Sequence, residues 1–308
     1  MLNNNKDKMA MIKGLIAPIL SPFNDDLSFN QSLYNSLAIE LLENGCSGLA
    51  PFGTTGEALS LSSAERMAAL EGLIDAGIDP EVIIPGTGLC NLPETIAISR
   101  HAVELGCAGV MTLPPFYFKA LGDDGYFEYF ERLIEGIDNN ELKIYLYHIP
   151  QVSGVGLSIE LVKRLRLAYP QTIVGIKDSS GNWDNTAQLL EIDGLIVYPG
   201  SELCVIDSIQ RGGPGCISAT ANLNSGDISR VIALCHKAEW EEAEKLHEDV
   251  KAVRLLFQDY APIPAQKALL AKRSGDFNWN NLRPPLSPIS NTRRDDLANR
   301  LLSYGMSF

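Results

Sequence analysis

The chain lacks the close cysteine pairs that mark zinc-binding and dithiol redox motifs. Its six cysteines are scattered over 308 residues, at Cys46, Cys90, Cys107, Cys204, Cys216 and Cys235. Isolated cysteines in a chain of this size do not form a disulfide framework, so we expect reduced, buried thiols. Histidines at metal-ligand spacing are missing too, because the four present stand far apart at His101, His148, His236 and His247. No metal site is therefore expected.

Long apolar runs and a surplus of basic residues are also absent. The apolar runs fall short of the roughly 20 residues that a membrane helix needs, so no membrane span is expected. The formal net charge of -13 argues against a nucleic-acid partner, because phosphate binding requires clustered lysine and arginine. The first residues are polar and lack the apolar core of a secretory signal. We interpret residues 1–12 as a flexible tail on a cytoplasmic protein.

What the chain does contain is a regular alternation of short apolar runs and amphipathic segments. Continuous apolar runs are typical of parallel strands that are covered on both faces. Eight runs are expected to be strands, at 14–20, 48–52, 82–87, 109–113, 143–147, 172–177, 194–199 and 215–219. A helical pattern follows each run, and helix starts are marked by a capping box from Ser62 to Glu65, by Pro93 and by Ser158.

This order predicts the α/β class and a TIM (β/α)8 barrel over residues 13–238. Residues 239–308 are expected to form a C-terminal helical extension, with helical patterns at 239–259, 265–274 and 293–304 and a proline-rich connection at 283–288. A doubly wound Rossmann-like sheet is the structural alternative. It normally carries a glycine fingerprint after the first strand, and no such loop follows Gly14.

Lys177 ends an apolar, β-branched run at a position where a strand would deliver its amine into a buried site. In a TIM barrel the chemistry lies at the carboxyl ends of the strands. Burial disfavours an ammonium ion, and a free amine can attack a carbonyl carbon. The pattern therefore favours a lysine that forms an imine. The alternative is a strand-terminal lysine whose ammonium group reaches water.

Other expected strands also end in polar residues. Tyr147 could relay protons to a carbinolamine, although a tyrosine in a strand is more commonly a core residue. The turn from Gly53 to Gly56 offers free backbone N–H groups and two threonine hydroxyls, which suit a carboxylate, but it could equally be a tight turn capped by its own threonines. We assign Glu57 to a structural role, bonded to loop amides, and expect His148 to be packed or hydrogen-bonded rather than catalytic.

Four ordered motifs carry a resemblance to a known family. They are Gly53-Thr-Thr-Gly-Glu57, Tyr147-x-Ile-Pro-x-x-Ser-Gly154, Gly175-Ile-Lys-Asp-Ser-Ser-Gly181 and Pro262-Ile-Pro264. With them, residues 14–288 resemble the dihydrodipicolinate synthase and N-acetylneuraminate lyase family. Any one motif alone is weak, but four in order at expected strand ends argue against chance similarity.

The resemblance implies a class I aldolase or lyase that acts on pyruvate or a related 2-oxo acid together with an aldehyde, without a cofactor. It implies that Lys177 forms the Schiff base and that Tyr147 shuttles protons. Thr54 would link Tyr147 to a second tyrosine from a neighbouring subunit, for which Tyr117 is the nearest candidate. The loop around Tyr117 is one residue longer than usual in the family, so Phe116 or Phe118 could occupy that position instead. A homotetramer built from two dimers is also implied.

Several further residues match positions around such a site. Thr54 and Thr55, in the turn that begins at Gly53, would hold the 2-oxo acid carboxylate. Gly200 and Ile217 match backbone positions that line the lysine pocket. Ser179, Glu202 and the loop at 116–119 are candidates for recognising the second substrate.

A pyridoxal phosphate site is disfavoured, because no phosphate-binding loop is paired with an acidic partner for the cofactor ring.

Two departures from the family pattern leave the second substrate open. Val152 stands where dihydrodipicolinate synthases normally have an arginine, although another basic residue could substitute for it. Sialic acid lyases usually have an Asp-Glu pair after the strand-seven glycine, whereas Gly200 is followed by Ser201, Glu202 and Leu203. One hypothesis is that the substrate is derived from a sugar acid or is a hydroxy-oxo acid. Dihydrodipicolinate synthase activity in lysine biosynthesis, N-acetylneuraminate lyase activity and a non-catalytic 2-oxo-acid-binding protein are the alternatives.

Overall fold

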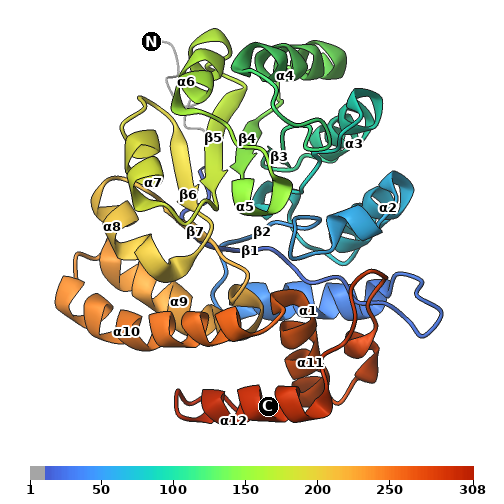
Figure 1. Cartoon of the computed structure of the whole chain (residues 1–308), viewed down its shortest axis with the longest axis vertical. Coiled ribbons are helices and arrows are strands. Elements are labelled where there is room, and N and C mark those ends of the chain that lie inside the picture. Colours follow the sequence, from blue (N-terminus) through green and yellow to red (C-terminus); the bar gives the residue numbers. More distant parts are fainter. Residues whose placement is uncertain (1–10) are drawn as a thin grey trace.

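The computed structural model describes residues 11–308, in which parallel strands at the centre are surrounded by helices (Figure 1). Strand β1 (Gly14–Ala17) lies between β2 (Gly48–Leu49) and β7 (Gly215–Ile217). A second group runs in the order β3 (Val110–Thr112), β4 (Ile144–His148), β5 (Ile173–Asp178) and β6 (Ile196–Pro199). All of these pairings are parallel. They place the carboxyl ends of the strands at one end of the barrel.

The expected run at 82–87 joins the two groups of strands through isolated bridges instead of a regular ladder. Ile83 pairs with Leu49 of β2 on one side, and Gly86 pairs with Met111 of β3 on the other. A Cβ atom on Gly86 would lie 2.2 Å from the carbonyl oxygen of Phe52, so only glycine permits this close approach. All eight expected runs therefore lie at the centre, and the barrel prediction is confirmed.

In the described part of the chain, eight helices form the ring around the strands. They are α1 (Gln31–Glu43), α2 (Ser63–Asp75), α3 (Leu92–Glu104), α4 (Asp123–Ile137), α6 (Ile159–Ala168), α7 (Trp183–Leu190), α8 (Val205–Gln210) and α9 (Ala221–His236). Short α5 (Pro150–Ser153) follows β4. The expected capping box is present, because Ser62 accepts a hydrogen bond from the amide of Glu65 while the Glu65 carboxylate accepts one from the amide of Ser62. Pro93 lies in the first turn of α3, and Ser158 caps α6.

Short 3-10 turns complete the connections. They are η1 (Ala58–Ser60), η2 (Pro80–Val82), η3 (Glu202–Cys204), η4 (Phe257–Asp259) and η5 (Phe277–Asn280). Two of them lie close to expected strand ends: η1 follows the Gly53 turn, and η3 follows β6.

The interior of the barrel is filled by side chains from the strands, as in other barrels of this kind. One buried cluster includes Ile16, Ala50, Ile84, Met111, Tyr145, Val174, Tyr198 and Ile217. The hydroxyl group of Tyr198 donates a hydrogen bond of 2.7 Å to the carbonyl oxygen of Ile12. Ile12, which the sequence places in the tail, is therefore buried at the start of the barrel. Met11 of the expected tail is partly buried, and residues 1–10 lie outside the described residues.

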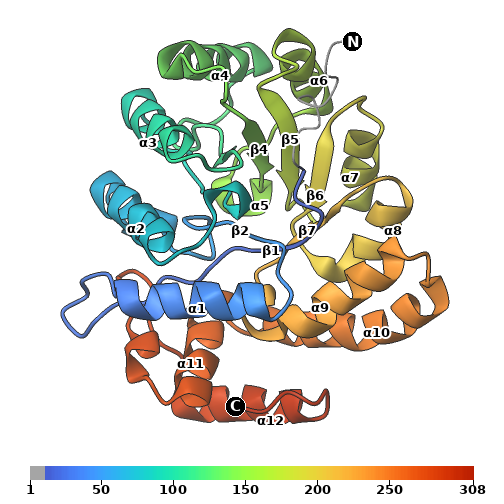
Figure 2. The same ribbon diagram turned by 180° about the vertical axis from the view of Figure 1, so that it is seen from behind.

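The C-terminal segment contains three helices, as expected: α10 (Trp240–Leu256), α11 (Pro262–Ser274) and α12 (Asn291–Leu302). In both views α10 runs along α9, while α11 lies next to α1 outside the ring and α12 lies on the far side of α11 (Figures 1 and 2). None of the helices among residues 11–308 combines the length and apolar character needed to cross a membrane.

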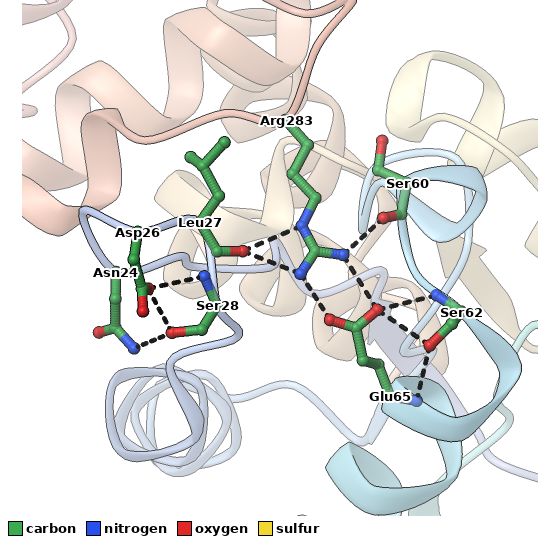
Figure 3. Close-up of polar contacts among 8 residues, drawn as sticks. All are labelled: Asn24, Asp26, Leu27, Ser28, Ser60, Ser62, Glu65 and Arg283. Carbon is green, nitrogen blue, oxygen red and sulfur yellow. Dashed lines mark hydrogen bonds and ion pairs between the residues drawn. The ribbon is translucent and has the colours of Figure 1, made fainter.

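Arg283, in the connection between α11 and α12, ties this segment to the barrel (Figure 3). Its guanidinium donates hydrogen bonds to the carbonyl oxygens of Leu27 at 2.8 Å and Ser60 at 2.6 Å, and to the Glu65 carboxylate at 3.0 Å. The hydrogen bonding of Arg283 to Glu65 lowers the pKa of this carboxyl group to about 2. The same carboxylate completes the capping box of α2, so one charge pair fixes the extension, η1 and α2 together.

Lys267 of α11 makes a second, fully buried connection. Its ammonium donates to the carbonyl oxygens of Ser21 at 2.8 Å and Asn281 at 2.6 Å, and to Glu57 Oε1 at 2.8 Å. Both members of the ion pair have fully buried side chains. Glu57 has the structural role that we assigned to it, but the expected partner was wrong. An ammonium group from the C-terminal segment, rather than loop amides, neutralises its charge.

We expect Lys267→Met to lower the free energy of unfolding by about 3 kcal/mol, because it leaves a buried carboxylate without its counter-charge. Urea unfolding at a fixed protein concentration measures this change. The matched control is the double variant Lys267→Met with Glu57→Gln, which removes both charges and should recover most of the loss. A single variant as stable as the parent would show that the pair does not hold the Gly53 turn against α11.

Candidate active site

Lys177 and Tyr147 are neighbours at the ends of two adjacent strands. The register pairs Tyr147 of β4 with Lys177 of β5, so both side chains leave the sheet at the same level. Both are buried, with 4% and 3% of their surface exposed. The Lys177 Nζ atom lies 4.5 Å from the centroid of the Tyr147 ring. The structure thus brings together the two residues that the sequence predicts as an amine and a proton relay.

Thr54 joins this pair from the loop that follows β2. Its Oγ1 atom lies 3.3 Å from the hydroxyl oxygen of Tyr147, within hydrogen-bonding distance. The loop is fixed from beneath, because Ser21 Oγ donates a hydrogen bond of 2.7 Å to the carbonyl oxygen of Gly56. A Cβ atom on Gly56 would lie 2.7 Å from the carbonyl oxygen of Ile19, so glycine is required there. The amine, the phenol and the threonine hydroxyl therefore form one cluster on rigid elements.

The cluster opens into a cavity of about 450 Å³ at the carboxyl ends of the strands. Thr55, Ser179 and Gly200, which the sequence also predicts as site residues, line this cavity. A Cβ atom on Gly200 would lie only 1.9 Å from Ser179 Oγ, so a side chain at this position would push the strand ends apart. The volume lies in the usual range for small-molecule sites.

Three other predicted residues do not line this cavity. Gly53 faces a second cavity of about 230 Å³, which shares Thr54 and Tyr147 with the first. Ile217 is fully buried in the barrel interior. Glu202 is also fully buried, and its carboxylate accepts a hydrogen bond from Ser218 Oγ. The turn of η3 directs Glu202 into the protein, which argues against its predicted contact with the substrate.

Tyr117 lies outside both cavities, and 75% of its surface is exposed. Its ring packs edge-on against the ring of Phe118, with 5.5 Å between the ring centroids. Phe116 instead lines the second cavity. Within this chain the structure does not bring Tyr117 to the Lys177 cluster.

The polar neighbours of the cluster have structural partners. The carboxylate of Asp178 accepts hydrogen bonds from the Ser180 amide at 2.9 Å, Asn185 Nδ2 at 3.0 Å and Thr186 Oγ1 at 2.7 Å. His148 Nδ1 accepts a hydrogen bond of 2.9 Å from the Leu157 amide, and burial lowers the pKa of this histidine. His148 is thus hydrogen-bonded, as predicted. Among residues 11–308, no group of three histidine, cysteine, aspartate or glutamate residues could hold a metal ion.

The sequence reasoning missed several cavity residues. Arg254, Gln258 and Gln266 reach the larger cavity from the C-terminal segment. Arg66 of α2 lines the second cavity, and its burial lowers the pKa of its guanidinium to about 10. Arg66, Arg254 and Gln266 occupy ordinary positions on helices and Gln258 lies in the η4 turn, so no local pattern sets them apart. Only the packing of these helices onto the barrel reveals them.

The geometry suits addition to a carbonyl group. A buried amine next to a phenol provides a nucleophile and a proton donor for the oxygen that is released. The threonine hydroxyls and backbone N–H groups of the Gly53 turn can donate to a carboxylate.

Comparisons with known proteins all point to one family. The model of the dihydrodipicolinate synthetase family matches residues 11–303. A 4-hydroxy-tetrahydrodipicolinate synthase of Methanosarcina mazei is 33% identical over 303 residues, which cover 96% of this chain and 99% of the relative. An uncharacterized DapA-like lyase of Chloroflexus aurantiacus is 33% identical over 285 residues, covering 92% and 94% of the two chains.

Solved structures match over similar lengths. The dihydrodipicolinate synthase of Agrobacterium tumefaciens superposes with a TM-score of 0.87 at 32% identity and covers 94% of this chain and 99% of its own. YagE of Escherichia coli K12, a family member solved in complex with pyruvate, has a TM-score of 0.89 at 25% identity, with coverage of 96% and 100%.

Proposed function

Because the chain belongs to the dihydrodipicolinate synthetase family, and is therefore a class I aldolase or lyase that works through a Schiff base, we propose that Lys177 forms this Schiff base with pyruvate or a closely related 2-oxo acid. The observation that carries the proposal is the buried Nζ atom, 4.5 Å from the centroid of the Tyr147 ring in a cavity of about 450 Å³. The pyruvate complex of the related YagE supports the choice of 2-oxo acid.

The proposed steps use only residues of the cluster. The Lys177 amine adds to C2 of the 2-oxo acid while the Tyr147 hydroxyl donates a proton to the carbonyl oxygen, which gives a carbinolamine. Loss of water gives an iminium ion. This ion accepts the electron pair of a C3–H bond while the proton moves to the Tyr147 oxygen, which gave up its own proton in the first step, and an enamine forms. The enamine C3 then attacks an aldehyde carbon, and water hydrolyses the product from Lys177; cleavage follows the same steps in reverse.

Thr54 and Thr55 hold the 2-oxo acid carboxylate in this proposal. Both line the cavity next to Tyr147, and the Gly53 turn adds backbone N–H groups. The test of the whole proposal needs no aldehyde. Loss of the C3 protons of pyruvate in heavy water, followed by NMR, reports enamine formation directly.

Dihydrodipicolinate synthase activity is the second candidate, because the relatives of Methanosarcina mazei and Methanococcoides burtonii are named 4-hydroxy-tetrahydrodipicolinate synthases. It predicts turnover of aspartate semialdehyde with pyruvate. Val152, 62% exposed, lines the cavity and offers no charge to the carboxylate of that aldehyde. Steady-state rates with aspartate semialdehyde, compared with those for other anionic aldehydes, decide between the specific synthase and an aldolase of different specificity.

We further propose a cytoplasmic homotetramer, built as a dimer of dimers, in which the loop around Tyr117 packs against another subunit. Tyr117, Phe118 and Leu121 are exposed by 75%, 64% and 48%, an apolar patch of the kind that proteins usually cover. If Tyr117 reaches the Thr54 hydroxyl of that subunit, its exposure in the single chain is accounted for.

Light scattering should therefore give a mass near four times the 33.6 kDa of the chain. The double variant Tyr117→Ser with Phe118→Ser should give a smaller species, because two apolar anchors are removed from the contact. Leu167→Ser, at an 85% exposed position on α6, is the matched control and should leave the mass unchanged. A monomer in the parent protein would contradict the shared tyrosine.

A further inference from the structure

The larger cavity has a wall that does not come from the barrel strands. Helices α10 and α11 and the turn between them contribute Arg254, Gln258, Pro262, Ile263 and Gln266 to the lining. The strand ends supply the Lys177 cluster on the other side. The two sides therefore carry different chemistry, and the helical wall has no part in the imine steps proposed above.

Arg254 stands out on this wall because its guanidinium has few partners. Its Nη1 atom donates one hydrogen bond of 3.3 Å to Thr220 Oγ1, and its buried Nε atom has no partner. Within residues 11–308 it forms no ion pair, whereas Arg283 and Arg300 each hold a carboxylate. A buried donor without a partner costs roughly 1 to 3 kcal/mol, so its presence calls for an explanation.

Gln266 of α11 shows the same feature independently. Its side chain is buried and lines the same cavity, and its Oε1 atom has no hydrogen-bond partner. One wall thus carries an unsatisfied donor and an unsatisfied acceptor. Both side chains line the cavity, so a ligand with an anionic group and a hydroxyl group would lie against a guanidinium and a side-chain amide.

The charges around the cavity indicate which part of a ligand this wall would bind. Of the described residues that line it, only Lys177 and Arg254 are cationic. In the proposed reaction Lys177 is used for the imine, and the acidic Asp178 is held by its own three hydrogen bonds. Arg254 is therefore the one cation left for a second substrate. Val152 supplies none on the opposite side.

The size of the cavity leaves room for that second substrate. A volume of about 450 Å³ lies within the range of about 300 to 1,000 Å³ that is usual for pockets holding whole small-molecule ligands. Pyruvate has six heavy atoms, so a bound 2-oxo acid next to Thr54 and Thr55 fills only part of this space. The remainder extends to the helical wall.

We propose that Arg254 determines specificity for the second substrate by binding an anionic group, a carboxylate or a phosphate, at the end remote from the reacting carbon. The side-chain amide of Gln266 hydrogen-bonds a hydroxyl group of the same substrate. The proposal rests on the proposed function, because it assigns the second substrate of the Lys177 imine. It narrows the aldehyde, or the fragment released in cleavage, to anionic compounds.

A structural role for Arg254 is the competing explanation. Glu202 is a buried carboxylate whose Oε1 atom lacks a partner, and both charges act on the thiol of Cys216. No contact within 4.0 Å pairs Arg254 with Glu202 among the described residues, but a longer-range counter-charge would still stabilise the fold. Such a role predicts lower stability without any selectivity between substrates.

The test compares matched aldehydes that differ in one anionic group, with pyruvate as the partner. Glyceraldehyde 3-phosphate is compared with glyceraldehyde, and succinic semialdehyde with butanal. Pyruvate consumption gives kcat/KM for each aldehyde. The parent protein should prefer at least one anionic member by about tenfold to a hundredfold, the range expected for charge-assisted hydrogen bonds. The pair with the larger preference distinguishes a phosphate site from a carboxylate site.

Arg254→Gln should remove that preference by lowering kcat/KM for the anionic aldehyde at least tenfold more than for its neutral partner. Arg254→Lys keeps the charge and should retain part of the preference. Arg230→Gln, an exposed arginine on α9 outside this cavity, is the matched control and should keep the parent ratio. Thermal unfolding of each variant separates loss of selectivity from loss of fold.

Three results would overturn the proposal. The parent could show no faster condensation with either anionic aldehyde than with its neutral partner. Arg254→Gln could lower kcat/KM equally for both aldehydes of a pair, which would mean that Arg254 stabilises the fold and does not select the substrate. Its effect could fall on the KM for pyruvate alone, which would place the 2-oxo acid carboxylate at Arg254. Borohydride trapping of pyruvate on the parent is run first, so failure of the imine itself is recognised separately.

Discussion

Replacing Lys177 with alanine should reduce the exchange of the C3 protons of pyruvate to the uncatalysed rate, a fall of about four orders of magnitude or more. The exchange requires an iminium ion, and among the described residues that line the cavity only Lys177 carries an amine. Without it, no group draws electrons from the C3–H bond. NMR of pyruvate in heavy water gives the exchange rate for parent and variant directly.

Two further variants separate the nucleophile from the charge. Lys177→Arg keeps a cation near the Tyr147 ring but cannot form an imine, so it should be as inactive as Lys177→Ala. Lys245→Ala removes an exposed lysine of α10 outside the cavity and should exchange at the parent rate. Exchange that persists in Lys177→Ala, with the fold intact by circular dichroism, would remove Lys177 from the proposed chemistry.

Tyr147→Phe should slow the same exchange by about a thousandfold, within the usual range for a positioned acid or base. The ring remains, so the contact with the Lys177 Nζ atom is kept and only the hydroxyl group is lost. Borohydride should still trap an adduct on Lys177 after long incubation, because the nucleophile is present. A variant that exchanges as fast as the parent would show that protons reach the carbinolamine by another route.

The threonine beside Tyr147 gives a graded control for this result. Thr54→Val removes the hydroxyl that lies 3.3 Å from the tyrosine oxygen while keeping the branched shape of the side chain, whereas Thr54→Ser keeps the hydroxyl. We expect the exchange rate of the serine variant to stay close to that of the parent. The rate of the valine variant should fall between those of the parent and Tyr147→Phe. Equal rates for both would mean that the contact does not orient the phenol.

The sequence predicted the barrel and the Lys177 cluster because both follow from local patterns. Apolar runs covered on two faces indicate parallel strands, and in this fold the strand ends converge. Lys177, Tyr147 and Thr54 each stand at or just after such an end, so their proximity follows from the topology. The register between β4 and β5 then places Tyr147 level with Lys177.

The direction of the Glu202 side chain could not be predicted in this way. Glu202 follows the Gly200 turn at a strand end, the same kind of position that Lys177 occupies. The direction of its side chain depends on how η3 winds and on the Ser218 hydroxyl that bonds its carboxylate, and neither can be seen in a local pattern. A residue next to a site in sequence can therefore be buried beneath it.

Arg254 and Lys267 make contacts in the structure that the sequence did not indicate. Each is one polar residue on an amphipathic helix, where most such residues face water. Whether it reaches the cavity or a buried carboxylate depends on how the C-terminal helices pack against the barrel. Lys267 contacts Glu57, which is 210 positions away in the chain. Contacts between elements so distant in sequence cannot be predicted from periodicity.

Mapping the pyruvate adduct tests the central claim most directly. The protein is incubated with pyruvate, reduced with borohydride, digested and analysed by mass spectrometry. The proposed chemistry predicts one reduced pyruvyl group, located on Lys177 and absent from Lys177→Ala. An adduct on another lysine, or no adduct with pyruvate or with a panel of related 2-oxo acids, would contradict the assignment of Lys177 as the imine-forming residue.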